Sequence, residues 1–146
     1  MHRNEHTVEI DRPPADVFPH LIASEQRLAW MGALTESAQV TEGEPQFGTR
    51  FRDVFEDHGQ RIEIDAEVVE WKPNERLATR LRGSAFEATA RQNLEEIDGR
   101  TRLVTTIDTE YKSRIARLMA GVVTRHAQRR LEEDLVRLKQ IVERES

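Results

Sequence analysis

The middle and the last third of the chain follow two different hydrophobic patterns. From Val40 to Tyr111, apolar and polar residues alternate in short runs separated by turn residues, which is typical of antiparallel strands. From about Lys112 to Glu145 the chain has no proline and a single glycine, Gly121, and it is rich in residues that favour helices. Together these patterns predict a curved sheet closed over one long amphipathic helix, with a cavity between them.

The residues before Val40 predict one strand and two short helices. Residues His6–Asp11 alternate with period two, and Pro13 ends this strand because proline has no amide hydrogen for the next ladder bond. Pro14 suits the first turn of a helix, and Ser24 is placed to cap a second one. Two short helices between the first and second strands would close one end of the sheet.

A meander of about six strands follows, and turn residues separate its members. This order, a strand, two short helices, the meander and a long helix, predicts an α+β fold in one domain spanning residues 1–146. The expected strands of the meander cover residues 38–41, 49–56, 61–68, 77–82, 86–95 and 103–111.

Composition narrows the class of protein. With 37% hydrophobic and 34% charged residues, the 146-residue chain is suited to a single core and a well-solvated surface. The net charge of -5 argues against a general nucleic-acid binder, and the absence of cysteine excludes disulfides and thiolate catalysis. No apolar run approaches the ~18 residues of a membrane span, and we expect a cytoplasmic protein.

Two apolar stripes on the long helix do not share a face. Leu131 follows Val122 by nine residues, roughly 180° around a helix at ~100° per residue. We therefore expect the helix to bend or break between Gly121 and Arg130, or its first stripe to contact something else. We favour the bend, with Leu118, Met119 and Val122 covering the mouth of a cavity. The first stripe comprises Ile115, Leu118, Met119, Val122 and His126, and the second Leu131, Leu135, Leu138 and Val142.

The first half of this helix is also basic. Such a run could attract an anionic ligand, a lipid head group or RNA, although a solvated face is its usual meaning. Because no aromatic residues are interleaved with it, we expect no nucleic-acid binding. The basic residues are Arg114, Arg117, Arg125, Arg129 and Arg130.

Five short motifs in order resemble the START-like (SRPBCC) superfamily, which includes the Bet v 1 allergens and the polyketide cyclase/dehydrase-like proteins. The resemblance implies a helix-grip fold: a bent antiparallel sheet of about seven strands around a C-terminal helix, with two short helices after the first strand and a ligand cavity inside. It implies no universal catalytic residue. The motifs are Ile10–Phe18 with Trp30, Phe47–Phe51, Val68–Leu77, Gly99–Leu103, and Leu138–Lys139 followed by Glu143.

The strand residues that are predicted to face inward include large apolar side chains as well as small or hydroxylated ones. A core that needed only stability would carry larger side chains at the alanine and threonine positions, so these positions leave room for a ligand. The alternative is that they allow the helix to approach the sheet closely. The predicted ligand-binding residues are Trp30, Phe51, Phe55, Ile64, Ala66, Val68, Thr79, Leu81, Phe86, Ala88, Ala90, Gln92, Thr105, Ile107, Leu118, Met119 and Val122.

Two residues are weak catalytic candidates. Asp53, between two inward phenylalanines, could act as a general acid or base, or could simply pair with Arg80. Tyr111 could hydrogen-bond a carbonyl, as a cyclase would need. His126 is more simply a structural histidine, and His58 a turn residue. No Ser-His-Asp pattern or phosphate-binding loop appears, and we expect no metal and no cofactor.

These observations favour the binding or transport of a small hydrophobic ligand, such as a lipid, a polyketide or an aromatic metabolite. The alternative is a polyketide cyclase or dehydratase that uses acid-base residues in the same cavity. A third class is a partner-binding protein without a real pocket. We expect no stable membrane insertion, and the sequence leaves a homodimer open.

Overall fold

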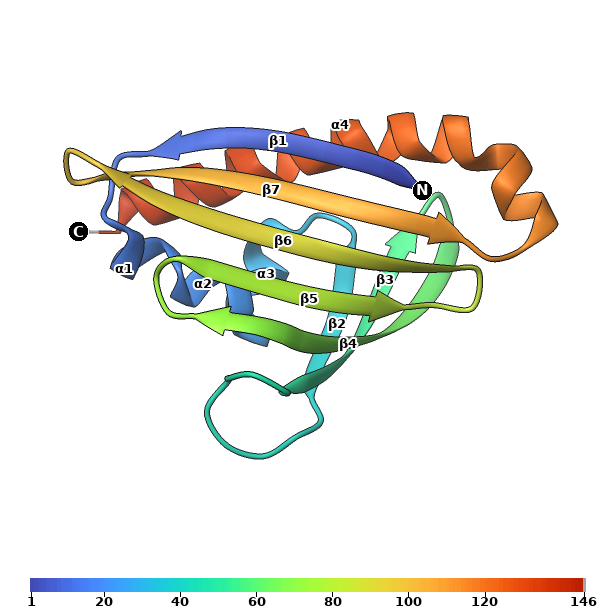
Figure 1. The fold of residues 1–146 in the computed structure, drawn as a ribbon, viewed down its shortest axis with the longest axis horizontal. Helices are drawn as coiled ribbons and strands as arrows, with labels where there is room; N and C mark the ends of the chain where they lie inside the picture. Colours follow the sequence, from blue (N-terminus) through green and yellow to red (C-terminus); the bar gives the residue numbers. More distant parts are fainter. Residues whose placement is uncertain (146) are drawn as a thin grey trace.

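A seven-stranded antiparallel sheet and one long helix dominate the computed structural model, which describes residues 1–145 (Figure 1). Neighbouring strands follow the order β1-β7-β6-β5-β4-β3-β2. The strands are β1 (His2–Ile10), β2 (Leu34–Gln39), β3 (Arg50–Asp57), β4 (Gln60–Lys72), β5 (Arg76–Arg82), β6 (Phe86–Ile97) and β7 (Arg100–Tyr111). The helices are α1 (Pro14–Val17), α2 (Pro19–Ile22), α3 (Ser24–Trp30) and α4 (Arg114–Arg144). This is the helix-grip arrangement, and the α+β prediction is confirmed.

Tight turns and a bulge shape the sheet. His58 and Gly59, the central residues of the β3–β4 turn, both have positive φ values, 50° and 79°, as a type I′ hairpin requires. In β4 the register shifts between Val68 and Glu70, and a bulge of this kind bends a strand. As a result β4 curves under the sheet, and β2 and β3 run steeply across the direction of β5, β6 and β7 (Figure 1).

The connection between β1 and β2 holds three short helices rather than the two expected. Pro19 begins α2 directly after α1, which divides the first predicted helix. Ser24 does not cap α3; the N-cap is Ala23, and the Ser24 hydroxyl instead lies within hydrogen-bond distance of the Ser37 hydroxyl, at 2.7 Å. The second strand also begins earlier than predicted, at Leu34.

The C-terminal half of α4 anchors the helix in the core. Leu131, Leu135, Leu138 and Val142 are buried, as the second predicted stripe requires, and they belong to one apolar cluster with Ile10 and residues of the sheet. Burying side chains of this size contributes roughly 1.5–3 kcal/mol each relative to leaving them exposed. The leucine stripe therefore joins the helix to β1 and to the sheet interior.

Polar contacts tie the same half of α4 to neighbouring segments. Arg12 donates to the carbonyls of Glu143 and Glu145 at 2.8 and 2.7 Å, which satisfies carbonyls at the end of the helix. Near α3, Asp134 accepts from the Gly32 amide at 3.0 Å, and burial raises the pKa of this carboxyl despite that hydrogen bond. These contacts hold the C-terminal half of α4 against the three short helices.

The N-terminal half of α4 differs from the prediction. α4 is one helix from Arg114 to Arg144, and in Figure 1 its first turns incline toward the end of β7. Leu118, Met119 and Val122, expected to cover a cavity, are exposed on the solvent side. The buried position in this half of the helix is Ala120, which is 2% exposed.

The two halves of α4 provide a matched test of this packing. Leu138→Ala should lower the free energy of unfolding by about 3 kcal/mol, because it leaves a cavity in the core. Leu118→Ala should change it by less than about 0.5 kcal/mol, because that side chain is exposed. Urea unfolding followed by circular dichroism measures both values, and equal losses would contradict the assignment of the buried face.

Candidate functional site

The concave side of the sheet encloses a small inner cavity of about 80 Å³ near the short helices. That volume holds a few water molecules, whereas pockets for drug-sized ligands measure roughly 300–1,000 Å³. Helices α2 and α3 close one side of it, and strands β3 to β6 form the other. The lining residues are Leu21, Ile22, Arg27, Trp30, Met31, Phe51, Asp53, Phe55, Ala66, Leu77, Thr79, Leu81, Ala90 and Gln92.

A buried ion pair forms the polar part of the inner cavity. The Asp53 side chain is 1% exposed, and both of its oxygens bind the Arg27 guanidinium, at 2.9 and 3.1 Å. The Ser37 hydroxyl donates to the same carboxylate at 2.7 Å, and the guanidinium lies over the Phe51 ring, 4.9 Å from its centroid. With its oxygens occupied in this way, Asp53 is held as a structural partner of α3.

The partner expected from the sequence was therefore wrong. Asp53 faces inward between the phenylalanines as predicted, but Arg80 lies on the opposite, outer face of β5 and is exposed. Arg27 reaches the carboxylate from α3, 26 positions earlier in the chain. The only sign of this pair in the sequence was that Arg27, a charged residue, falls on the buried side of a short helix.

A second, larger cavity lies at the opposite end of the space between the sheet and α4, beside the N-terminal half of that helix. Its volume is about 740 Å³, within the range of small-molecule sites. One wall is the start of β4 and the β5–β6 turn, and the other is α4 together with Tyr111, whose hydroxyl lies 3.5 Å from Thr124 Oγ1. The lining residues of this outer cavity are Gln60, Arg61, Ile62, Glu63, Ser84, Ala85, Phe86, Tyr111, Ala116 and Val123.

Close to the outer cavity, the β3–β4 turn is tied to α4. Asp57 binds His126 Nε2 at 2.8 Å and Arg130 Nη2 at 2.7 Å, so His126 has the structural role that the sequence favoured. Burial raises the pKa of Asp57, but the His126 hydrogen bond and the charge of Arg130 outweigh it and lower that pKa below its usual value. Asp57, His58 and His126 place metal-ligand atoms within 4.8 Å of one another, but Arg130 and His126 already satisfy both carboxylate oxygens.

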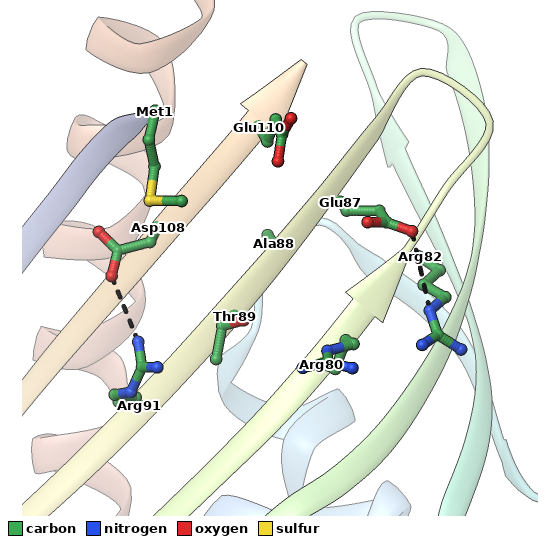
Figure 2. A pocket seen from close by; sticks show the side chains of 9 residues that line it. All are labelled: Met1, Arg80, Arg82, Glu87, Ala88, Thr89, Arg91, Asp108 and Glu110. Atoms are coloured by element: carbon green, nitrogen blue, oxygen red, sulfur yellow. Dashed lines mark hydrogen bonds and ion pairs between the residues drawn. The ribbon is translucent and has the colours of Figure 1, made fainter. Parts of the chain in front are cut away.

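The outer face of the sheet carries a shallow groove of about 260 Å³ (Figure 2). Figure 2 shows that most of its side chains are charged, with Arg91 paired to Asp108 at 3.3 Å and Arg82 to Glu87 at 3.8 Å. The Arg82–Glu87 pair is exposed on both sides, which is typical of a solvated surface, whereas Asp108 is buried beneath its arginine partner. The groove therefore does not match the chemistry of a hydrophobic ligand.

The structure divides the predicted ligand-binding residues among several environments. Trp30, Phe51, Phe55, Ala66, Thr79, Leu81, Ala90 and Gln92 line the inner cavity, and Phe86 lines the outer one together with the catalytic candidate Tyr111. Ile64, Val68, Ala88 and Thr105 are buried and Ile107 is half-buried, but these five line neither cavity, and Leu118, Met119 and Val122 are exposed.

Residues of α4 that line the outer cavity were missed by the sequence analysis. Ala116 and Val123 are seven positions apart and therefore share a helix face, with Ala120 between them. This stripe of small residues was the available signal. It was overlooked because the larger side chains of Leu118, Met119 and Val122 were taken to mark the face that turns inward.

Comparison with known proteins identifies the family. Residues 1–143 match the family described as "Polyketide cyclase / dehydrase and lipid transport". The chain belongs to this family. A search among curated proteins found no match.

Solved structures share the fold at low sequence identity. Protein TTHA0849 from Thermus thermophilus is 20% identical with a TM-score of 0.83, and the alignment covers 97% of each chain. The Zhui aromatase/cyclase from Streptomyces sp. R1128 is 19% identical with a TM-score of 0.82, over 98% of this chain and 94% of that one. Ara h 8.0201 is 17% identical with a TM-score of 0.71, and the alignment covers 97% of each chain. At such identities the likeness establishes the fold alone.

Breaking the buried pair should be costly. Asp53→Ala leaves the Arg27 guanidinium buried without its partner, and should lower the free energy of unfolding by about 3–5 kcal/mol. The matched control is Asp65→Ala, which removes an exposed pair with Arg52 and should cost less than about 0.5 kcal/mol. Denaturant unfolding of both variants measures the difference. A loss below about 1 kcal/mol for Asp53→Ala would contradict the burial of the pair.

Proposed function

We propose that the protein binds a small, mostly hydrophobic ligand in the outer cavity, between the sheet and the N-terminal half of α4. The observation that carries this proposal is the size of the cavity, about 740 Å³, together with apolar walls that include Ile62, Phe86 and Val123. A cavity of this kind is suited to a ligand whose apolar surface would otherwise face water. The family description, which includes lipid transport, agrees with this chemistry.

The lining also indicates the shape of the ligand. The polar residues among the lining are Gln60, Arg61 and Glu63 at the start of β4, Ser84 in the β5–β6 turn and Tyr111 of β7. The remaining walls are largely alanine, valine, isoleucine and phenylalanine. An apolar body with a polar end, as in a lipid, a polyketide or an aromatic metabolite, satisfies both parts of this surface.

Binding is favoured over catalysis by the state of the acid-base candidates. Asp53 is engaged by Arg27 and Ser37 and faces the inner cavity, which is too small for such a ligand. Tyr111 lines the outer cavity, but the one hydrogen-bond partner of its hydroxyl among residues 1–145 is the Thr124 hydroxyl. A general acid or base is normally positioned by a hydrogen bond to a titratable or charged group, and in residues 1–145 the Tyr111 hydroxyl makes none, although the His2 ring packs edge-on at 5.4 Å between ring centroids.

Filling the outer cavity should weaken ligand uptake. Val123→Phe combined with Ala116→Phe places two rings in the cavity and should raise the dissociation constant of 1-anilinonaphthalene-8-sulfonate about tenfold, because the probe loses its apolar contacts. The control is Val136→Phe, on the same helix but outside the cavity, which should change the constant less than about twofold.

Fluorescence titration measures the three proteins, and circular dichroism checks that each is folded. The proposal fails if the filled variant is folded and binds the probe as tightly as the wild type. It also fails if Val136→Phe reduces binding as much as the cavity variant does, because the probe would then report on the general surface of α4.

A cyclase or dehydratase is the second candidate because Tyr111, which carries an ionisable hydroxyl, lines the outer cavity. Under the binding proposal, incubation with a linear poly-β-ketone should leave both the mass and the retention time of that compound unchanged for the wild type and for Tyr111→Phe. Liquid chromatography with mass spectrometry checks this, because aldol cyclisation changes the retention time at constant mass and dehydration lowers the mass by one water. Either change with the wild type but not with Tyr111→Phe would support the enzyme instead.

A further inference from the structure

The N-terminal half of α4 presents an apolar face to solvent. Ile115 and Leu118 are 76% and 80% exposed, and Met119 and Val122 are about half exposed. These four residues, called the apolar face below, lie on the side of the helix opposite the leucine stripe, as the helical angles require. Side chains of this size gathered on one exposed surface are typical of an interaction site.

Arginines border the apolar face. Arg114, Arg117, Arg125 and Arg129 are all exposed, and none of them forms an ion pair with another residue in the range 1–145. The sequence contains no acidic residue between Glu110 and Glu132. The surface is therefore strongly positive at this place, although the whole chain carries a net charge of -5.

We propose that the N-terminal half of α4 docks on the surface of an anionic lipid bilayer. In this arrangement the apolar face enters the boundary between head groups and acyl chains, and the bordering arginines bind lipid phosphates. The charge of the arginines complements such a surface, while the acidic remainder of the protein orients the molecule away from it. No helix in residues 1–145 is long and apolar enough to cross a membrane, so docking is peripheral.

A second copy of the chain is a poorer occupant of this face. A symmetric dimer places the same surface of both copies together, so the arginines of one copy would approach those of the other. No acidic residue of this segment is available to offset that repulsion. An anionic bilayer meets both the apolar and the charged requirement at once.

Docking places the outer cavity beside the lipid. Ala116 and Val123 of the same helical segment line that cavity, one turn or less from Met119 and Val122 along the chain. A ligand could then pass between the bilayer and the cavity without crossing water. The docking proposal depends only on the exposed surface of α4. The passage of a ligand between the bilayer and the outer cavity depends, in addition, on the proposed function.

The experiment is co-sedimentation of the purified chain with vesicles and no added ligand. With phosphatidylcholine vesicles that contain about 30% phosphatidylserine, we expect most of the protein to bind, and about tenfold less with pure phosphatidylcholine. Salt of about 0.5 M should reduce binding to the anionic vesicles, because it screens the arginines.

Paired variants separate this surface from general effects. Leu118→Ser with Val122→Ser should reduce the bound fraction at least fivefold, on the order expected from losing two anchoring side chains. Leu28→Ser with Val136→Ser, the same substitutions at exposed positions elsewhere, should not. Arg125→Gln with Arg129→Gln should reduce binding about tenfold, whereas Arg80→Gln with Arg144→Gln, of the same net charge, should leave it nearly unchanged.

Three outcomes overturn the proposal. One is wild-type protein that stays in the supernatant, and another is equal binding to neutral and anionic vesicles. The third is a dimer in sedimentation velocity that Leu118→Ser with Val122→Ser dissociates, because a second copy would then cover the face. Titration with 1-anilinonaphthalene-8-sulfonate in the same variants shows whether the outer cavity still binds, so failure here is distinguishable from failure of the proposed function.

Discussion

The burial of one leucine stripe on the C-terminal half of α4 is the contact on which the rest of the structure depends. A seven-stranded sheet has an apolar concave face that must be covered, and Leu131, Leu135, Leu138 and Val142 cover the part nearest β1 and the short helices. Because one half of the helix is sufficient as an anchor, the other half does not have to be buried. The outer cavity and the exposed apolar face both lie beside this second half.

Much of this architecture follows from sequence patterns. Period-two alternation located the strands, and the glycine in the β3–β4 turn marked the hairpin, because these signals are local. The 180° offset between the two helical stripes was also correct. The anchoring of the second stripe was predicted correctly, but the prediction that the first stripe also turns inward was wrong, because a leucine is equally compatible with a buried face and with an exposed one. Ala116, Ala120 and Val123 were passed over for the reason that small residues resemble ordinary helix formers.

The candidate site was less accessible to sequence analysis than the fold. The inward position of Asp53 followed from strand phase, but its partner depended on how α3 returns over the sheet, and no local pattern encodes that return. A buried arginine–carboxylate pair offsets a large desolvation cost only with good geometry and further hydrogen bonds, which Ser37 and the carbonyl of Ile22 supply here. The pair thus closes the end of the protein interior that lies next to the short helices, and leaves little free volume there.

The division of the interior into a filled end and an open end also bears on the exposed face of α4. If the ligand occupied the inner cavity, the apolar surface of Leu118 and Val122 would have no relation to it, since no residue of α4 lines that cavity. The open volume instead lies where α4 turns small residues inward and large apolar ones outward. One helical segment then has two apolar surfaces, one toward a cavity and one toward solvent. Exposing an apolar surface to water is costly, and this surface borders the opening of a hydrophobic cavity. The simplest explanation is that the surface and the cavity opening contact the same apolar phase.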